Sequence, residues 1–108
     1  YSRRYGGMVM YKIVFTKQAL KDLDNLKKSG LSSKAKVLVD VIRENPYQNP
    51  PRYEKLVGNL QGTFSRRINI QHRLVYQVYE EKFMENEVNY DGTIKIIRMW
   101  THYEGLNA

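Results

Sequence analysis

The sequence of 108 residues contains no cysteine, which excludes disulfide bonds, thiolate metal sites and a cysteine nucleophile. It also lacks any apolar run near the roughly 20 residues that a membrane-spanning helix requires. No apolar signal-peptide core is found at the N-terminus, so the sequence predicts a cytoplasmic protein without a membrane partner. Its length fits one domain, and the 42% hydrophobic and 27% charged residues are typical of a globular chain.

Negative charge is scarce over most of the chain. Residues 1–79 carry 15 Lys and Arg against 5 Asp and Glu, whereas residues 80–91 carry one Lys against five acidic residues. The formal net charge of the whole chain is +7. A basic excess of this kind favours a polyanionic partner, above all nucleic acid, and a solvated lysine-rich surface is the alternative.

The first half of the chain has the spacing of one strand and two helices. We predict a β-strand over residues 11–15 and an amphipathic helix over residues 17–28, with Thr16 as its N-cap. Gly30 suits the end of this helix, and Ser32 or Ser33 suits the start of a second one. This second helix must end before Pro46, because the residue that precedes a proline avoids the helical conformation.

The second half has the pattern of a long loop followed by strands. Residues 46–62 contain all three prolines and predict a loop of functional importance. Strands are expected over residues 64–70, 73–79 and 93–102, with an acidic hairpin at residues 80–92 that ends in Asp-Gly. This order predicts an α+β fold, in which an αα hairpin packs on one face of an antiparallel β-sheet and the other face can line a site.

Known metal and phosphate motifs are missing. The only histidines are His72 and His102, and neither has a carboxylate one helical turn away. The acidic segment lacks a calcium-loop pattern, no glycine-rich phosphate loop occurs, and Ser65 lacks the glycines of a nucleophile elbow. We therefore expect no metal and no cofactor.

What remains is a set of acid–base and cationic side chains. Glu54 is the only carboxylate between Glu44 and Glu80 and lies between the cations of Arg52 and Lys55. An ionised carboxylate in this position suits a general base for a ribose 2′-hydroxyl, and an ordinary surface glutamate is the alternative.

Three arginines crowd the two strands after the loop. Arg66, Arg67 and Arg73 can bind phosphate through their planar guanidinium groups, and Arg67 and Arg73 share a face if the turn keeps register. Residues 64–79 contain no acid, which favours an anion site over cross-strand ion pairs. His102 can act as an acid near neutral pH. The set suits attack of a 2′-hydroxyl on the adjacent phosphodiester.

The run FSRRINIQHRLVY from Phe64 to Tyr76 resembles the YoeB/Txe family of toxins, within the RelE/ParE superfamily. The loop NPYQNPPRYEKLVGNLQG and the pair His102-Tyr103 are similar to the same family, and the resemblance covers roughly residues 10–103. It implies a β-α-α-β-β-β fold and a metal-independent endoribonuclease that cuts mRNA at the ribosomal A site. Residues 10–108 would then form one toxin domain, preceded by a leader or cloning remnant at residues 1–9.

The resemblance also implies a role for each candidate residue. Glu54 is the general base, Arg73 stabilises the pentacoordinate phosphate, and His102 protonates the leaving 5′-oxygen. The residues expected to bind RNA or phosphate are Arg67, Arg66, Tyr103 and Lys55.

The resemblance further implies several partners. These are a cognate YefM/Phd-type antitoxin, the ribosome with its mRNA, operator DNA reached through the antitoxin complex, and a second copy of the chain. Two alternatives stay open: a ParE-like toxin that binds DNA gyrase without cutting RNA, and a non-catalytic RNA-binding module. Only the nuclease needs the glutamate and the C-terminal histidine.

Overall fold

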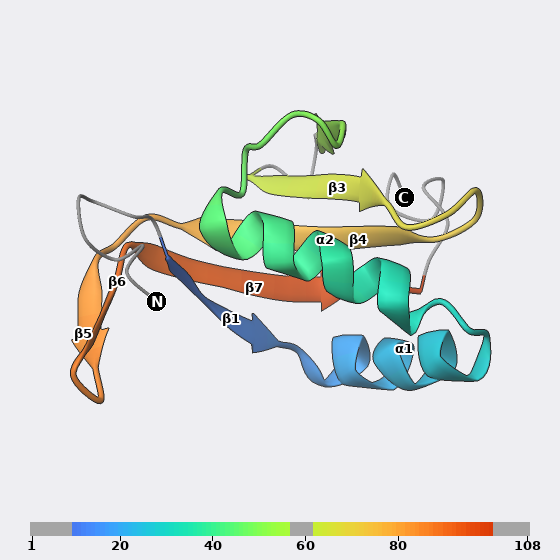
Figure 1. Cartoon of the computed structure of the whole chain (residues 1–108), viewed down its shortest axis with the longest axis horizontal. Coiled ribbons are helices and arrows are strands. Elements are labelled where there is room, and N and C mark those ends of the chain that lie inside the picture. Colours follow the sequence, from blue (N-terminus) through green and yellow to red (C-terminus); the bar gives the residue numbers. More distant parts are fainter. Residues whose placement is uncertain (1–9, 57–61, 101–108) are drawn as a thin grey trace.

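The chain folds into a five-stranded β-sheet with two helices and a separate small hairpin (Figure 1). The computed structural model describes residues 10–56 and 62–100. The elements are β1 (Tyr11–Phe15), α1 (Lys17–Lys28), α2 (Ser32–Glu44), β2 (Tyr53–Lys55), β3 (Thr63–Arg67), β4 (Arg73–Tyr79), β5 (Phe83–Glu85), β6 (Val88–Tyr90) and β7 (Gly92–Arg98). The large sheet has the order β1-β7-β4-β3-β2, and β5 pairs with β6. The predicted α+β class is confirmed.

Local sequence signals set the ends of the helices. The Thr16 hydroxyl accepts a hydrogen bond from the Ala19 amide at 3.0 Å and caps α1 as predicted. Gly30 has φ 74°, the left-handed conformation expected after α1. The predicted serine cap of α2 is wrong, because Leu31 is the N-cap residue and makes no side-chain bond. The Leu31 amide instead donates to the Leu26 carbonyl at 2.8 Å, so the end of α1 passes directly into α2.

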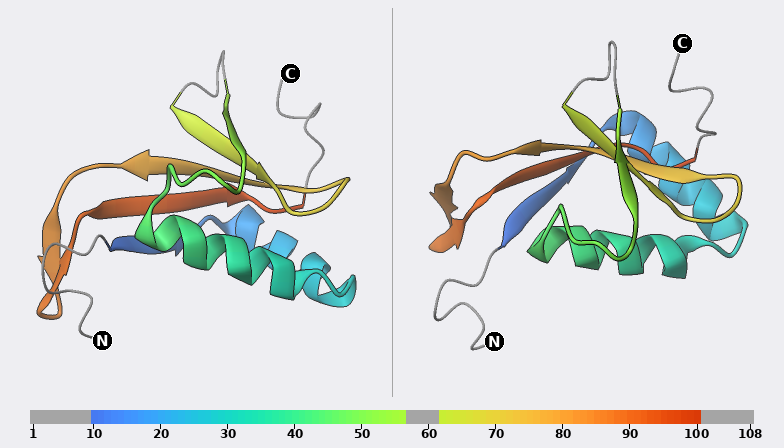
Figure 2. Two further views of the ribbon diagram at one scale, coloured as in Figure 1. Left: turned by 45° about the horizontal axis from the view of Figure 1, so that its top comes forward. Right: turned by 90° about the horizontal axis from the view of Figure 1, so that it is seen from above.

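The core lies between the helices and one face of the sheet. In the left view of Figure 2, both helices lie below β3, β4 and β7. The buried side chains from the two layers include Ala19, Leu26, Ala35, Leu38, Ile42, Phe64, Leu74, Tyr76, Ile94 and Ile96. Burial of these apolar side chains is the main favourable term for this packing. The opposite faces of β2, β3 and β4 are therefore the ones available for polar side chains.

One strand pairing differs from the predicted antiparallel sheet. β1 runs parallel to β7, with Ile13 opposite Ile94, whereas the other pairs in the large sheet are antiparallel. Residues 16–91, which include both helices and five other strands, separate β1 from β7, so no tight turn has to join this parallel pair. Gly92 opens β7 where the strands approach closely, because a Cβ there would lie 2.2 Å from the Tyr79 carbonyl oxygen.

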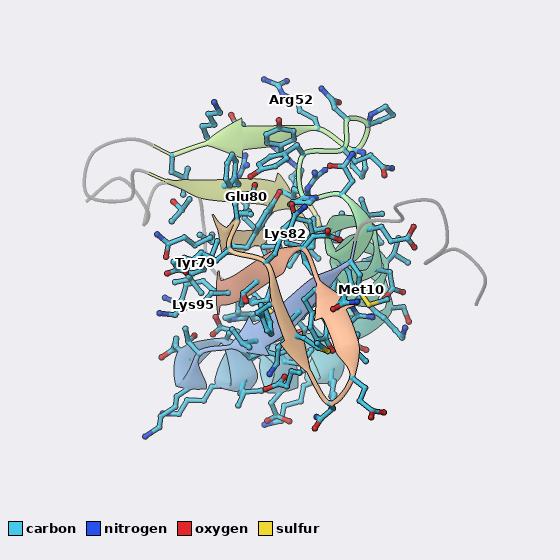
Figure 3. All side chains as sticks on the ribbon, turned by 90° about the vertical axis from the view of Figure 1, so that its left-hand side faces the viewer. Met10, Arg52, Tyr79, Glu80, Lys82 and Lys95 are labelled. Carbon is cyan, nitrogen blue, oxygen red and sulfur yellow. The ribbon has the colours of Figure 1, made fainter. Side chains whose placement is uncertain are left out.

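Further boundaries differ from the prediction. β3 ends at Arg67 and not at residue 70, and β7 ends at Arg98 and not at residue 102. The loop expected at residues 46–62 contains β2, because β3 offers this segment an edge with which it can pair. The acidic hairpin turns at Asn86 and Glu87, which have φ 50° and 66°, and Asp-Gly leads into β7 instead. Figure 3 looks onto this hairpin, with Glu80 and Lys82 at its base. Within residues 10–56 and 62–100, no helix is long and apolar enough to cross a membrane.

A buried carboxylate links α1 to the end of β7. Asp22 is 1% exposed and accepts hydrogen bonds from Arg98 Nε at 2.8 Å, the Met99 amide at 2.9 Å and Gln18 Nε2 at 3.0 Å. Burial alone would raise the pKa of Asp22, but the bonds from Arg98, Met99 and Gln18 outweigh burial and lower this pKa below its usual value. The charged form of Asp22 therefore stabilises the fold.

We expect Asp22→Asn to lower the free energy of unfolding at pH 7 by about 2 kcal/mol, since a charged acceptor of several bonds is lost. Because the folded-state pKa is lowered, the wild-type contribution is present at neutral pH and is lost as the pH falls through that pKa, below about pH 4. Urea unfolding across this range should show the two proteins converging in acid. Asp24→Asn, on the exposed side of α1, is the control; a loss as large as that of Asp22→Asn would contradict the assignment.

Candidate active site

β2, β3 and β4 bring three of the predicted site residues, Glu54, Arg67 and Arg73, to one sheet face. In the strand register Glu54 lies opposite Ser65, and Arg67 lies opposite Arg73. Because side chains alternate along a strand, Glu54, Ser65, Arg67 and Arg73 all project to the face opposite the core. The prediction that Arg67 and Arg73 share a face is confirmed. Both arginines flank the β3–β4 turn, at the end of the sheet opposite the β5–β6 hairpin (Figure 1).

These side chains line a cavity of about 460 Å³. Its lining residues are Pro51, Arg52, Tyr53, Glu54, Ser65, Arg67 and Arg73. Three guanidinium groups and a single carboxylate give the cavity a net positive charge. Planar guanidinium groups match the oxygens of phosphate, so the cavity suits a phosphodiester better than an apolar ligand.

An ion pair joins the two central residues of this site. Arg73 Nη1 lies 2.7 Å from Glu54 Oε1 and 3.4 Å from the Ser65 hydroxyl oxygen. The Arg73 side chain is 13% exposed and that of Glu54 is 35% exposed, so both remain open to a ligand in the cavity. The sequence pattern missed this pair, because the acid that Arg73 meets comes from β2 and not from residues 64–79.

Two other residues of the cavity differ in how well the sequence identified them. Arg67 is exposed, and no carboxylate of the described residues forms an ion pair with it. Ser65 is fully buried and was not predicted as a site residue. The alternation of β3 places Ser65 on the same face as Arg67, and this signal could have identified it.

The structure removes Arg66 from the predicted phosphate-binding group. Arg66 is 0% exposed and points to the core face, where its guanidinium donates to backbone carbonyls and to Tyr76. Lys55 is exposed, but it alternates with Glu54 along β2 and does not line the cavity. The cause in both cases is the side-chain period of two, which turns neighbours of a site residue to the other face.

His102 and Tyr103 lie outside the described residues. The last described residue, Trp100, stacks on His72, with ring centroids 3.8 Å apart and an interplanar angle of 15°. His72 directly precedes Arg73 at the start of β4. The described chain therefore ends beside the strand that carries Arg73.

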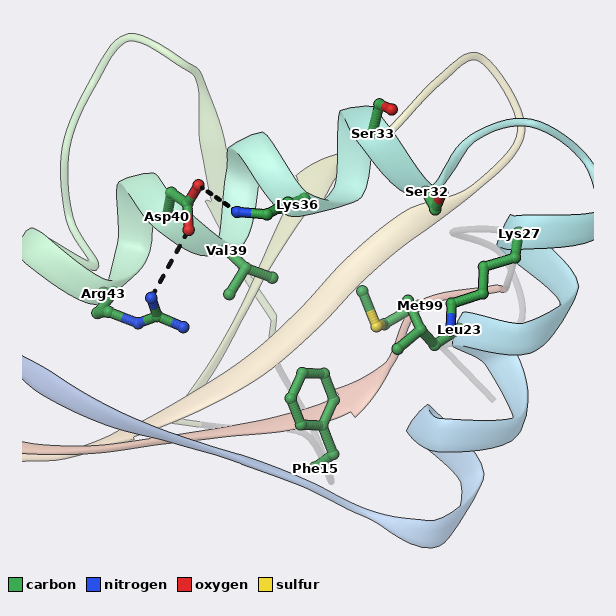
Figure 4. A pocket seen from close by; sticks show the side chains of 10 residues that line it. All are labelled: Phe15, Leu23, Lys27, Ser32, Ser33, Lys36, Val39, Asp40, Arg43 and Met99. Carbon is green, nitrogen blue, oxygen red and sulfur yellow. Dashed lines mark hydrogen bonds and ion pairs between the residues drawn. The ribbon is translucent and has the colours of Figure 1, made fainter.

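A second cavity, of about 380 Å³, lies between the helices and the end of the sheet (Figure 4). Apolar side chains such as Phe15, Leu23, Val39 and Met99 form its inner wall, and Figure 4 shows Asp40 on α2 paired with Lys36 and Arg43. None of the predicted site residues lines it. The described residues include no cluster of three or more His, Asp or Glu side chains that could bind a metal ion.

Comparison with known proteins places this geometry among bacterial toxins. Residues 15–103 match the model of a family described as YoeB-like toxin of bacterial type II toxin-antitoxin system. Toxin YoeB from Synechocystis sp. is 35% identical over 77 residues, which cover 68% of this chain and 87% of that protein.

Two solved structures from Staphylococcus aureus are each 32% identical to the chain. The YoeB dimer aligns with a TM-score of 0.67 over 88% of this chain and 100% of its own. The YoeB-YefM complex aligns with a TM-score of 0.64 over 86% of this chain and 98% of its own.

Proposed function

The chain belongs to the YoeB-like toxins of bacterial type II toxin-antitoxin systems, and on this premise we propose that it is a metal-independent endoribonuclease that cuts mRNA at the ribosomal A site. The observation that supports the proposal most directly is the contact between Glu54 and Arg73 in a cavity rich in arginine. A carboxylate beside a phosphate-binding guanidinium is the pairing that 2′-hydroxyl attack on a neighbouring phosphodiester needs.

In the proposed reaction, Glu54 removes the proton from the ribose 2′-hydroxyl, and the 2′-oxygen forms a new bond to phosphorus. Arg73, with Arg67 across the strand pair, stabilises the negative charge that builds on the phosphoryl oxygens. The bond from phosphorus to the 5′-oxygen then breaks, and His102 supplies the proton that this oxygen takes up. The products are a 2′,3′-cyclic phosphate and a 5′-hydroxyl end.

The position of Arg73 suggests how substrate engages Glu54. The guanidinium contacts Glu54 through Nη1, and its planar fork of several N–H donors also suits a phosphate that enters the cavity. The phosphate then lies within reach of the carboxylate that must act as base. Tyr103 is proposed to help place the substrate nucleotide.

We also propose the partners of this toxin. The related S. aureus protein is solved with YefM, and a YefM/Phd-type antitoxin with an acidic segment would complement the arginine-lined cavity of this chain. Operator DNA would be bound through that complex. The S. aureus YoeB dimer supports a homodimer as a further assembly.

A primer-extension assay on translated mRNA tests the proposed function. We expect cuts within the A-site codon, with a 5′-hydroxyl on the downstream fragment and a cyclic phosphate on the upstream one. Hydrolysis by a water molecule that a metal ion activates commonly leaves end groups other than a 5′-hydroxyl and a cyclic phosphate. A 5′-phosphate on the downstream fragment would therefore contradict the proposed mechanism. Binding to ribosomes without any cut would instead favour a non-catalytic RNA-binding module, and inhibition of DNA gyrase would favour a ParE-like toxin.

A further inference from the structure

The Pro-rich segment at residues 46–51, which precedes Glu54, is bound to the core by one buried cation. Arg66 is the last residue but one of β3 and is 0% exposed. Every nitrogen of its guanidinium donates a hydrogen bond: Nε to the Tyr76 hydroxyl at 3.0 Å, Nη2 to the carbonyls of Pro46 and Gln48 at 3.1 and 2.8 Å, and Nη1 to the Pro51 carbonyl. No carboxylate of the described residues pairs with this guanidinium, so the carbonyl dipoles are what stabilise its charge.

The segment at residues 46–51 needs such a donor. Three of its residues are prolines, which have no N–H to give to a neighbouring strand. Carbonyl groups that are buried without a donor cost free energy, so the path of the segment depends on where donors are available. The guanidinium of Arg66 offers them at three points along that path.

Two tyrosines add to this attachment. The Tyr76 hydroxyl accepts from Arg66 and donates to the Pro46 carbonyl at 2.7 Å. Burial raises the pKa of Tyr76, although Arg66 opposes the rise, so the phenol remains a donor at neutral pH. On the outer side the Tyr47 hydroxyl donates to the Glu80 carboxylate, and burial together with this bond raises the pKa of Tyr47.

The contacts of Arg66 with the Pro-rich segment lie next to the candidate active site. Tyr53 pairs with Arg66 across β2 and β3, and the Arg66 Cζ atom lies 4.9 Å from the centre of its ring. Glu54 is the next residue, and its carboxylate projects to the opposite face, where it meets Arg73. The same guanidinium therefore contacts the chain at Pro51 and at Tyr53, just before the proposed general base.

We propose that Arg66 is a positioning residue that sets the place of Glu54 by fixing residues 46–53 against β3 and β4. The inference rests on the proposed function, because it assigns Arg66 to the nuclease reaction without contact with RNA. Arginine is needed there because its planar fork reaches several carbonyls at once, whereas a lysine ammonium is a single point.

The first test compares the kinetics of Arg66→Lys with those of the wild type. We expect kcat for ribosome-dependent cleavage to fall by about tenfold or more with KM unchanged, since misplacing a reacting group slows the chemical step. Arg43→Lys, on the exposed side of α2, is the matched control and should keep both constants. A raised KM with unchanged kcat would indicate that Arg66 binds substrate and would overturn the inference.

The second test asks whether Arg66 acts through Glu54. If it does, Arg66→Lys should cause little further loss in a Glu54→Gln background, because the group that it positions is already gone. Losses that multiply in the double variant would overturn the inference. Tyr76→Phe is a milder variant, because it removes one hydroxyl from the same hydrogen-bond network. We expect it to lower kcat by about fivefold.

Amide hydrogen exchange gives a readout that does not depend on activity. In Arg66→Lys and Tyr76→Phe, we expect the amides of β2 to lose protection while those of α1 and β7 keep it. Unchanged protection in β2 would overturn the positioning role even in an active enzyme. If the wild type cuts no mRNA, the proposed function fails, and the exchange data still decide whether Arg66 fixes the Pro-rich segment.

Discussion

Glu54→Gln is expected to slow mRNA cleavage by about 10²–10⁴-fold, the usual contribution of a positioned general base. The amide keeps the shape of the side chain and can still accept a hydrogen bond from Arg73, but it cannot take a proton from the 2′-hydroxyl. Ribosome binding should be unchanged, because Arg52, Arg67 and Arg73 remain in the cavity.

Single-turnover primer extension with saturating toxin isolates this chemical step. Glu87→Gln, at the exposed turn of the acidic hairpin, is the matched control and should cut at the wild-type rate. If Glu54→Gln cuts as fast as this control while it still binds ribosomes, the carboxylate is not the base and the proposed mechanism is wrong.

Arg73→Met is expected to lower cleavage by about 10²–10³-fold, which is what the loss of one preorganised donor to a transition-state anion commonly costs. Arg73→Lys should recover only part of this loss. Its ammonium group is a compact point charge and lacks the planar fork with which a guanidinium contacts a carboxylate and a phosphate at once. Arg73→Met also leaves Glu54 without its ion-pair partner.

The stability of the Arg73→Met protein must be measured alongside its cleavage rate. The Glu54 side chain is 35% exposed, so water can replace Arg73 as its partner. We therefore expect Arg73→Met to lower the free energy of unfolding by less than about 1 kcal/mol. Arg43→Met controls for the general loss of a cation. A folded Arg73→Met protein with full activity would exclude Arg73 from the reaction.

Much of the fold could be predicted because it rests on local signals. Helical spacing and the Thr16 cap predicted α1 with its observed bounds, and the apolar run at residues 11–15 predicted β1. The sequence did not show which strands would be neighbours in the sheet. The parallel partner of β1 lies at the far end of the chain, and β2 forms only because β3 provides an edge.

The candidate site shows the same division. Glu54 and Arg73 could be selected by residue type, but their contact depends on the register of three strands. Arg66 and Arg67 are neighbours of identical chemistry, and only the alternation of a paired strand decides which of them is buried. The prediction about Arg66 failed for this reason, since a run of cations does not show which face each one takes.

The pairing of β1 with β7 has a consequence for how the protein folds as it is synthesised. Among the described residues, β7 is the only strand beside β1 in the sheet, and it also lies beside β4 at the centre. The helices that follow β1 therefore have no complete sheet on which to pack until residues 92–98 have left the ribosome. Contacts between such distant segments form late, because closing a long loop costs entropy before the contacts are made. The candidate site on β2, β3 and β4 would thus take its final form only after residues 92–98 have left the ribosome.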